Sequence, residues 1–241
     1  MILILGDIHA EYEIVNNQIE YVEATYGIKV DSVIQLGDFG IYKEPLEDYF
    51  DNNKQQFTRP LYFIDGNHED FWNLESLTGK YRNYFKPLER GEKYSISGYN
   101  FLAIGGASYM DPVNTPPGAV ITEDNIKKSL LHESKEIDIV ITHDCPSGIG
   151  IPGTAGFEYC GPTGFKDGHI LLKRYRPKVW FFAHHHKWFS AFIGRTLFVG
   201  LGLAKEGFAL LNKDYDIKII KRTVSIKKPG RIFNIFKELR R

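Results

Sequence analysis

Short apolar runs that stop at or near a glycine recur along the first part of the chain. Residues 1–5, 32–36 and 61–64 form three such runs, each suited to a strand buried on both faces of a sheet. Between the first two runs, apolar residues at helical spacing predict a helix that ends at Gly27: Ile14, Val15, Ile19, Val22 and Tyr26. A polar segment at residues 45–56 can hold a second helix. This alternation predicts parallel strands joined by crossover helices.

The rest of the chain adds antiparallel strands and a long loop. Residues 93–97 and 100–105 flank Gly98 closely enough for a hairpin. Thr122 is suited to cap the start of a helix. Further strands are expected at residues 137–141, 179–182, 197–199, 208–211 and 215–219. Glycine and proline in residues 145–168 predict a long irregular loop, and such loops in compact domains are usually functional.

The composition is that of an ordinary globular protein. The 241 residues include 30 Lys or Arg and 30 Asp or Glu, so the formal net charge is zero, and 43% are hydrophobic. These values exclude a disordered chain, a collagen and a protein that coats nucleic acid through bulk charge. Cys145 and Cys160 lack C-x-x-C spacing, so they provide neither a disulfide framework nor a thiolate zinc site. The apolar residues 1–5 are too few for a signal peptide, which predicts a cytoplasmic protein.

Polar side chains of metal-binding types follow five of the predicted strands. The segments are GDIH at 6–9, GD at 37–38, GNHE at 66–69, TH at 142–143 and AHHH at 183–186. In open α/β sheets the carboxyl ends of the strands line the ligand crevice, so these five turns are expected to converge. Aspartate, asparagine and histidine side chains form a mixed oxygen and nitrogen ligand set, which suits Mn, Fe, Zn or similar divalent ions.

Each of these residues has an ordinary structural interpretation when taken alone. An aspartate after a strand is most often part of a turn, and a single histidine such as His9 or His143 more often caps or packs. The triplet at residues 184–186 is also compatible with an exposed polar turn. The joint order favours function, because folding requires apolar residues at strand ends and not five sets of ligands.

This ordered set resembles the motifs of the calcineurin-like metallophosphoesterases, which read GDxH, GDxx, GNHE, H and GHxH. The resemblance covers residues 1–200, with Ala183 where that family usually has glycine. It implies an α/β fold, namely a four-layer α/β/β/α sandwich with a dinuclear metal site at the carboxyl ends of the strands. We therefore expect a metallophosphoesterase domain at residues 1–226.

The resemblance also implies roles for individual residues. Six side chains would hold two metal ions: Asp7, His9 and His186 the first, and Asn67, His143 and His184 the second. Asp38 would bridge the ions, and His68 would be the catalytic histidine that protonates the leaving group. The implied cofactors are two divalent metal ions, with manganese as the first choice and iron, zinc or nickel as alternatives.

The implied activity is hydrolysis of a phosphoester, either a monoester or a diester, by a hydroxide that bridges the two metals. Residues 37–42 lack the GDxVDRG sequence of serine/threonine protein phosphatases, which argues against that group. Residues 142–149 and 177–189 resemble segments of RNA lariat debranching enzymes, although Asp7 stands where those enzymes usually have cysteine. The alternatives are a nucleic-acid phosphodiesterase of the lariat-debranching type and a non-catalytic binding or scaffolding protein on the same fold.

Basic residues are concentrated at the C-terminal end. Residues 227–241 hold six Lys or Arg and one Glu, a net charge of +5, so the remaining body has a net charge of −5. Apolar residues at helical spacing predict a short basic amphipathic helix: Ile232, Phe233, Ile235, Phe236 and Leu239. This tail would either dock its apolar face on the body or bind nucleic acid or an anionic membrane surface. No transmembrane segment is expected, and the sequence indicates no oligomeric state.

Overall fold

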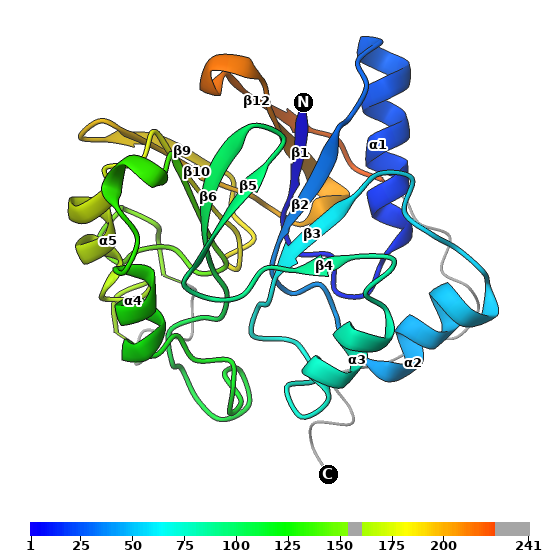
Figure 1. The fold of residues 1–241 in the computed structure, drawn as a ribbon, viewed down its shortest axis with the longest axis horizontal. Coiled ribbons are helices and arrows are strands. Elements are labelled where there is room, and N and C mark those ends of the chain that lie inside the picture. The colour runs from blue at the N-terminus through cyan, green and yellow to red at the C-terminus, as the bar shows by residue number, and fades with distance from the viewer. Residues whose placement is uncertain (154–160, 225–241) are drawn as a thin grey trace.

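The computed structural model describes residues 1–153 and 161–224, which form four layers (Figure 1). Two six-stranded sheets pack face to face at the centre. The outer face of the first sheet is covered by α1 (Glu13–Tyr26), α2 (Lys43–Leu46) and α3 (Leu74–Lys80). The outer face of the second sheet is covered by α4 (Glu123–Ser129) and α5 (Gly168–Tyr175). The predicted α/β/β/α sandwich is therefore confirmed.

The first sheet has the strand order β12-β11-β1-β2-β3-β4. Its strands are β1 (Ile2–Leu5), β2 (Ser32–Leu36), β3 (Leu61–Ile64), β4 (Lys86–Pro87), β11 (Gly207–Leu211) and β12 (Ile217–Lys221). The strands from β1 to β4 run parallel, as the crossover pattern predicts, and β11 and β12 join the sheet antiparallel. The carboxyl ends of β1, β2 and β3 consequently lie at one edge.

The second sheet has the strand order β5-β6-β7-β8-β10-β9. Its strands are β5 (Glu92–Ile96), β6 (Tyr99–Ile104), β7 (Ile139–Thr142), β8 (Val179–Phe182), β9 (Phe189–Ile193) and β10 (Thr196–Gly200). The four central strands are parallel, and β5 and β9 are antiparallel edge strands. The described residues also form a π-helix, Glu47–Asn52, and three short 3₁₀ helices: Ser134–Glu136, Ala204–Glu206 and Lys213–Tyr215.

Burial of β1 on both faces explains its continuous apolar run. Leu3 and Leu5 face outward and belong to the core shared with α1, which includes Val15. Ile2 and Ile4 face inward and pack in the core between the two sheets. A third core joins the outer face of the second sheet to α4 and α5. Three apolar cores between four layers make the sandwich the arrangement that buries every apolar face.

The predicted ends of two helices agree with the structure. Gly27 has a φ of 65°, and its backbone N–H donates to the carbonyl oxygen of Glu23, which ends α1 in a left-handed cap. The Thr122 hydroxyl accepts from the backbone N–H of Asn125, and the Asn125 side chain accepts in turn from the Thr122 backbone N–H. This reciprocal pair is a capping box at the start of α4.

Several predicted boundaries are displaced or incomplete. The helix expected at residues 45–56 begins at Lys43 and turns π-helical over Glu47–Asn52. The strand expected at 215–219 begins two residues later, at Ile217, as β12. The delay arises because residues 213–215 form a 3₁₀ turn first. The sequence pattern did not predict the strands β4 and β9 or the helix α3. The amphipathic helix predicted within residues 227–241 lies outside the described residues.

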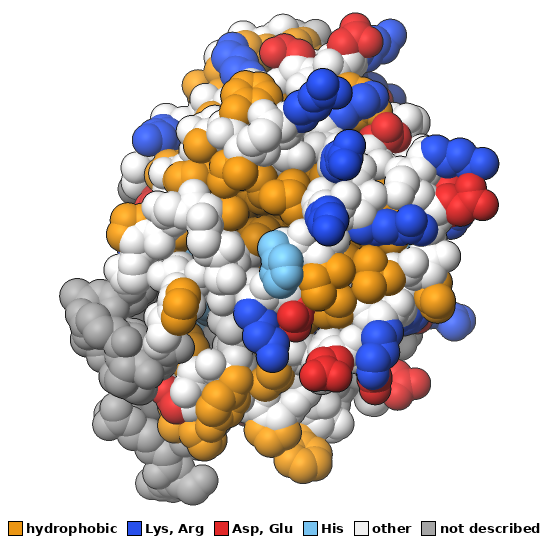
Figure 2. All heavy atoms as spheres, turned by 90° about the vertical axis from the view of Figure 1, so that its left-hand side faces the viewer, with side chains coloured by type: hydrophobic (Ala, Val, Ile, Leu, Met, Phe, Trp, Pro, Cys, Tyr) orange, Lys and Arg blue, Asp and Glu red, His pale blue; other side chains and the backbone are white. Residues whose placement is uncertain are grey.

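One face of the molecule carries α4, α5 and β9 (Figure 2). Hydrophobic side chains gather in the middle of this face, and lysine and arginine side chains surround them. The exposed hydrophobic residues on or beside these elements include Leu131, Ile170 and Phe192. None of the predicted metal ligands belongs to α4, α5 or β9, so this face supplies control positions away from the predicted site.

Candidate metal centre

The eight predicted site residues lie together at the carboxyl ends of β1, β2, β3, β7 and β8. Ligand atoms of Asp7, His9 and His186 all lie within 4.8 Å of one another, and so do those of Asp7, Asp38 and His143. The remaining three residues adjoin these groups. Asn67 Oδ1 lies 3.0 Å from His143 Nε2, the ring of His184 lies 4.9 Å from that of His143, and the ring of His68 lies 5.7 Å from that of His9.

Asp38 connects three of the five strand ends. Its Oδ1 accepts hydrogen bonds of 2.8 Å from the backbone N–H groups of Asn67 and His68. Its backbone carbonyl accepts from the N–H groups of Ile8, at 3.2 Å, and His9, at 2.9 Å. Gly66 leaves the necessary space, because a Cβ there would lie 2.0 Å from Asp38 Oδ1. The side chain of Asp38 is thus fixed to the loop after β3, and its backbone to the loop after β1.

Asp7 connects the first strand of one sheet to the histidine triplet of the other. Its Oδ1 accepts from the backbone N–H of His184 at 3.1 Å, and its Oδ2 lies 2.8 Å from His186 Nε2. Asp7 is 1% exposed. The two sheets are therefore joined at the predicted site by a buried carboxylate.

Three hydrogen-bond acceptors converge in the site, and one of them belongs to His143. Its Nδ1 lies 2.7 Å from the carbonyl oxygen of Leu36, so Nδ1 carries the proton and Nε2 faces the site. Nε2 lies 3.0 Å from Asn67 Oδ1 and 3.4 Å from Asp38 Oδ1. The Asn67 amide donates to the carbonyl oxygen of Asn114 at 2.7 Å, which turns its oxygen toward His143. Three lone-pair groups meeting at one point require a proton or a metal cation between them.

The carboxylates of the cluster are ionised. Burial alone would raise the pKa of Asp7 and of Asp38. The facing histidines outweigh it, His186 acting most strongly on Asp7 and His143 on Asp38, so both pKa values lie below the ordinary range. The site therefore presents two negative charges at neutral pH, as a site for two divalent cations requires.

The histidines divide into two groups. Burial lowers the pKa of His184 to about 4, so its ring is neutral and able to act as a ligand. Burial also lowers the pKa of His68. Burial lowers the pKa of His143 as well, but the charges of Asp38 and Asp7 raise it more, and the net shift is upward. This upward shift again indicates a position that attracts positive charge.

Four of the predicted ligands have a left-handed backbone. The φ values are 45° for His9, 53° for Asp38, 63° for His184 and 51° for His186. Residues other than glycine adopt this conformation infrequently, and it occurs preferentially at functional sites because the surrounding structure must hold it. Strained backbone at half of the eight positions indicates that these side chains are placed for chemistry.

Glu69 is a positioning residue that the sequence reasoning left aside. It follows β3 and precedes α3, which begins at Leu74. Its carboxylate accepts from the backbone N–H groups of Phe39, at 2.8 Å, Gly40, at 2.9 Å, and Ile41, at 2.6 Å. Glu69 therefore holds the loop that follows Asp38. The GNHE segment was the available signal.

Asp144 is a second residue that the sequence reasoning missed. Its Oδ1 lies 2.9 Å from His185 Nε2, and its Oδ2 accepts from the backbone N–H of Ser108 at 2.9 Å and from its hydroxyl at 2.7 Å. Asp144, Cys145 and His185 could also group around a metal. Both carboxylate oxygens are already hydrogen-bonded, and burial raises the pKa of the Cys145 thiol. This group adjoins a predicted ligand, because the ring of His185 lies 4.8 Å from that of His184.

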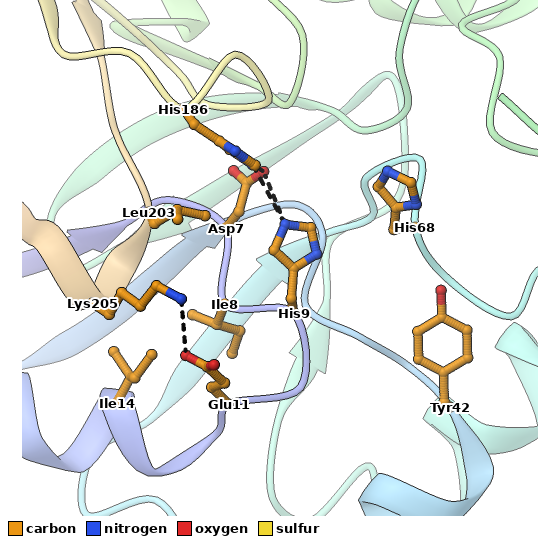
Figure 3. Close-up of a pocket in the computed structure, with 10 residues that line it drawn as sticks. All are labelled: Asp7, Ile8, His9, Glu11, Ile14, Tyr42, His68, His186, Leu203 and Lys205. Atoms are coloured by element: carbon orange, nitrogen blue, oxygen red, sulfur yellow. Dashed lines mark hydrogen bonds and ion pairs between the residues drawn. The ribbon is translucent and has the colours of Figure 1, made fainter. Parts of the chain in front are cut away.

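Two cavities flank the cluster. One, of about 280 Å³, lies on the side of His9 and has Ile8, Ile14 and Leu203 in its wall (Figure 3). The other, of about 310 Å³, includes Ser108 and Asn114 and is more polar. His68 and His186 line both cavities. A group bound at the cluster can therefore extend to either side.

This site and fold define a phosphoesterase. The profile of the calcineurin-like phosphoesterase family matches residues 1–188, and the chain belongs to that family. The chain is thus a hydrolase, and the family uses divalent metal ions, for which candidate ligand groups are present. Among the described residues, none of the helices is both long and apolar enough to cross a membrane.

Known proteins resemble the chain along most of its length. A lariat debranching enzyme of Entamoeba histolytica is 26% identical over 269 aligned residues, which span 92% of this chain and 73% of that enzyme. The phosphopantetheinyl hydrolase of Mycobacterium tuberculosis superposes with a TM-score of 0.56 at 10% identity, over 84% of this chain and 89% of that one. GAP50 of Plasmodium, an anchor in the inner membrane complex, gives 0.51 at 13% identity, over 94% and 90%. These two structural likenesses concern the fold alone.

Proposed function

We propose that the chain hydrolyses a phosphodiester of a nucleic acid with the help of two divalent metal ions, manganese being the ion of choice. The convergence of His143 Nε2, Asn67 Oδ1 and Asp38 Oδ1 on one point carries the metal part of this proposal. The likeness to a lariat debranching enzyme over 92% of the chain supports the diester part. Hydrolysis of a phosphomonoester is the alternative activity that the same site supports.

The donor set fits two cations. Six side chains would hold them in two groups of three: Asp7, His9 and His186, and Asn67, His143 and His184. Asp38 faces both groups, with Oδ2 3.9 Å from His9 Nε2 and Oδ1 3.4 Å from His143 Nε2. Aspartate, asparagine and neutral histidine are ligands that manganese accepts. The residues present are therefore suited to two divalent ions.

The two ions, when bound, would neutralise charge on the phosphoryl oxygens and make water acidic enough to supply a nucleophile near neutral pH. The chain's own residues provide the rest. Asp38 keeps the two ligand groups in register through its backbone contacts. His68 lines both cavities, so its imidazole lies beside a phosphoryl group held at the cluster and can give a proton to the departing oxygen.

The activity is tested with a panel of phosphoesters. We expect 4-nitrophenyl phosphate, bis(4-nitrophenyl) phosphate and linear or branched RNA to be cleaved under Mn²⁺, with the diesters preferred. A chelator should abolish the activity and added Mn²⁺ should restore it, because the bound ions would supply both the nucleophile and the neutralisation of the phosphoryl oxygens. Failure to hydrolyse any phosphoester at any divalent ion would contradict the proposal.

The basic tail is proposed to hold the polynucleotide. The last described residue, Val224, donates its backbone N–H to the carbonyl oxygen of Lys205 at 2.7 Å, and Lys205 lines the cavity beside the cluster. The six basic residues of 227–241 therefore follow a described segment that is hydrogen-bonded to a residue of that cavity. Their cations would contact phosphates on either side of the cleaved bond.

Deleting residues 229–241 is expected to weaken RNA binding and to leave hydrolysis of bis(4-nitrophenyl) phosphate within about twofold of its original rate, because four of the lost residues are Lys or Arg and none belongs to the cluster. Fluorescence anisotropy over a range of salt concentrations measures the effect, and the salt dependence should become shallower. The truncated protein would aggregate if the deletion uncovered an apolar surface of the body. If replacing the apolar residues of that surface by serine then restores solubility, the tail docks on the body instead.

A further inference from the structure

The cavity on the His9 side has a wall that ligation does not explain. Ile8 and Ile14 are buried, and together with Leu203 they form an apolar surface beside the cluster (Figure 3). None of these three side chains can bind a metal or a phosphoryl oxygen. An apolar wall directly beside an ionic centre fits a substrate that carries a flat or apolar group next to its phosphate.

The same cavity carries a paired acceptor and donor. Glu11 Oε2 lies 3.7 Å from Lys205 Nζ, and both side chains remain partly exposed, at 32% and 41%. The carboxylate accepts hydrogen bonds and the ammonium group donates them. The edges of nucleobases present neighbouring donors and acceptors, which can pair with such a combination.

The size and position of the cavity agree with a single ring system. Its volume of about 280 Å³ lies near the lower end for small-ligand sites, about 300 to 1,000 Å³. His68 and His186 form the side nearest the cluster. A phosphate held at the cluster would therefore place an adjoining nucleoside at the entrance to the apolar wall.

We propose that this cavity is a nucleobase subsite: the ring packs against Ile8, Ile14 and Leu203, and its edge faces Glu11 and Lys205. The subsite rests on the proposed function, because the phosphate of the same nucleotide occupies the metal cluster. It makes the protein prefer substrates whose scissile phosphate carries a nucleoside over substrates with a plain sugar or alkyl group. It also gives Glu11 and Lys205 a role in base preference.

Direct binding to the manganese-loaded full chain tests the subsite without requiring turnover. Calorimetry would compare the four common nucleoside 5′-monophosphates with ribose 5-phosphate, which lacks the base. We expect at least one nucleotide to bind about tenfold more tightly than ribose 5-phosphate, because the ring buries apolar area that the sugar phosphate leaves exposed. Leu203→Ser should remove most of that advantage and leave ribose 5-phosphate binding unchanged.

Matched variants separate the subsite from general damage. Leu131→Ser changes an 81% exposed leucine just after α4, and it should leave every affinity unchanged. Glu11→Gln adds a donor where only an acceptor stood, so the order of preference among the four bases should change. Glu20→Gln, at an exposed position of α1, should preserve that order.

Three results would overturn the subsite: ribose 5-phosphate binding as tightly as every nucleotide, Leu203→Ser weakening both kinds of ligand equally, or no binding of either. The subsite and the proposed activity fail separately. A retained base advantage without hydrolysis of any phosphoester would leave the subsite standing and reject the activity. Hydrolysis under Mn²⁺ without a base advantage would do the reverse.

Discussion

Asp38→Asn is expected to lower kcat/KM by about 10³- to 10⁵-fold, because the variant loses the charge shared by both ligand groups, a loss of several kcal/mol of stabilisation at the metal centre. The amide oxygen can still accept from the backbone N–H groups of Asn67 and His68, so the fold should persist. Steady-state kinetics on bis(4-nitrophenyl) phosphate under saturating Mn²⁺ measures the effect.

A second readout for this variant does not depend on turnover. Mn²⁺ should raise the Tm of the original protein, since an ion that binds only the folded state stabilises it, and this rise should be largely absent in Asp38→Asn. Asp124→Asn, at an 88% exposed side chain of α4, is the matched control and should behave like the original protein. Undiminished activity in the Asp38 variant would show that this carboxylate does not join the two groups.

His68→Ala is expected to lower kcat by about 10²- to 10⁴-fold, because the departing oxygen loses its proton donor. Metal binding should be retained, because the proposed ligands are six other side chains together with Asp38, and His68 is not one of them. The loss should be smaller for a 4-nitrophenyl ester than for an alkyl or nucleoside ester, because 4-nitrophenolate leaves readily without a proton. Parallel kinetics on both ester types measure this difference.

The control for His68 is His169→Ala, an exposed histidine that lies away from the cluster and hydrogen-bonds to the carbonyl oxygen of Lys166. It should leave both ester types unaffected. An equal loss on both esters in His68→Ala, together with lost metal, would identify His68 as a ligand and not as the proton donor.

The convergence of the site could be predicted because it depends on regular structure. Parallel strands place their carboxyl ends at one edge, so residues that follow β1, β2 and β3 must approach one another whatever the loops do. Burial on both faces makes such strands continuous apolar runs, which are easy to recognise. The order of the motifs then reveals the family resemblance, which assigns each candidate ligand to one of two metal ions.

The supporting contacts could not be predicted because they depend on loop conformation. Glu69 reaches three backbone N–H groups of the loop after Asp38, and Asp144 reaches Ser108 across 36 residues. No periodicity marks such contacts. The edge strand β9 alternates half-buried with exposed positions, and β4 has only two residues, so neither forms an apolar run. Sequence pattern therefore predicted the candidate ligands, which the fold brings together, and it did not predict Glu69 and Asp144, which contact the loops around them.

The most direct test of the two-metal centre is anomalous diffraction from crystals soaked in manganese. We expect two anomalous peaks per chain, one touching Asp7, His9 and His186 and the other touching Asn67, His143 and His184, with Asp38 in contact with both. No peak at these residues, or a single ion elsewhere in the molecule, would contradict the two-metal centre.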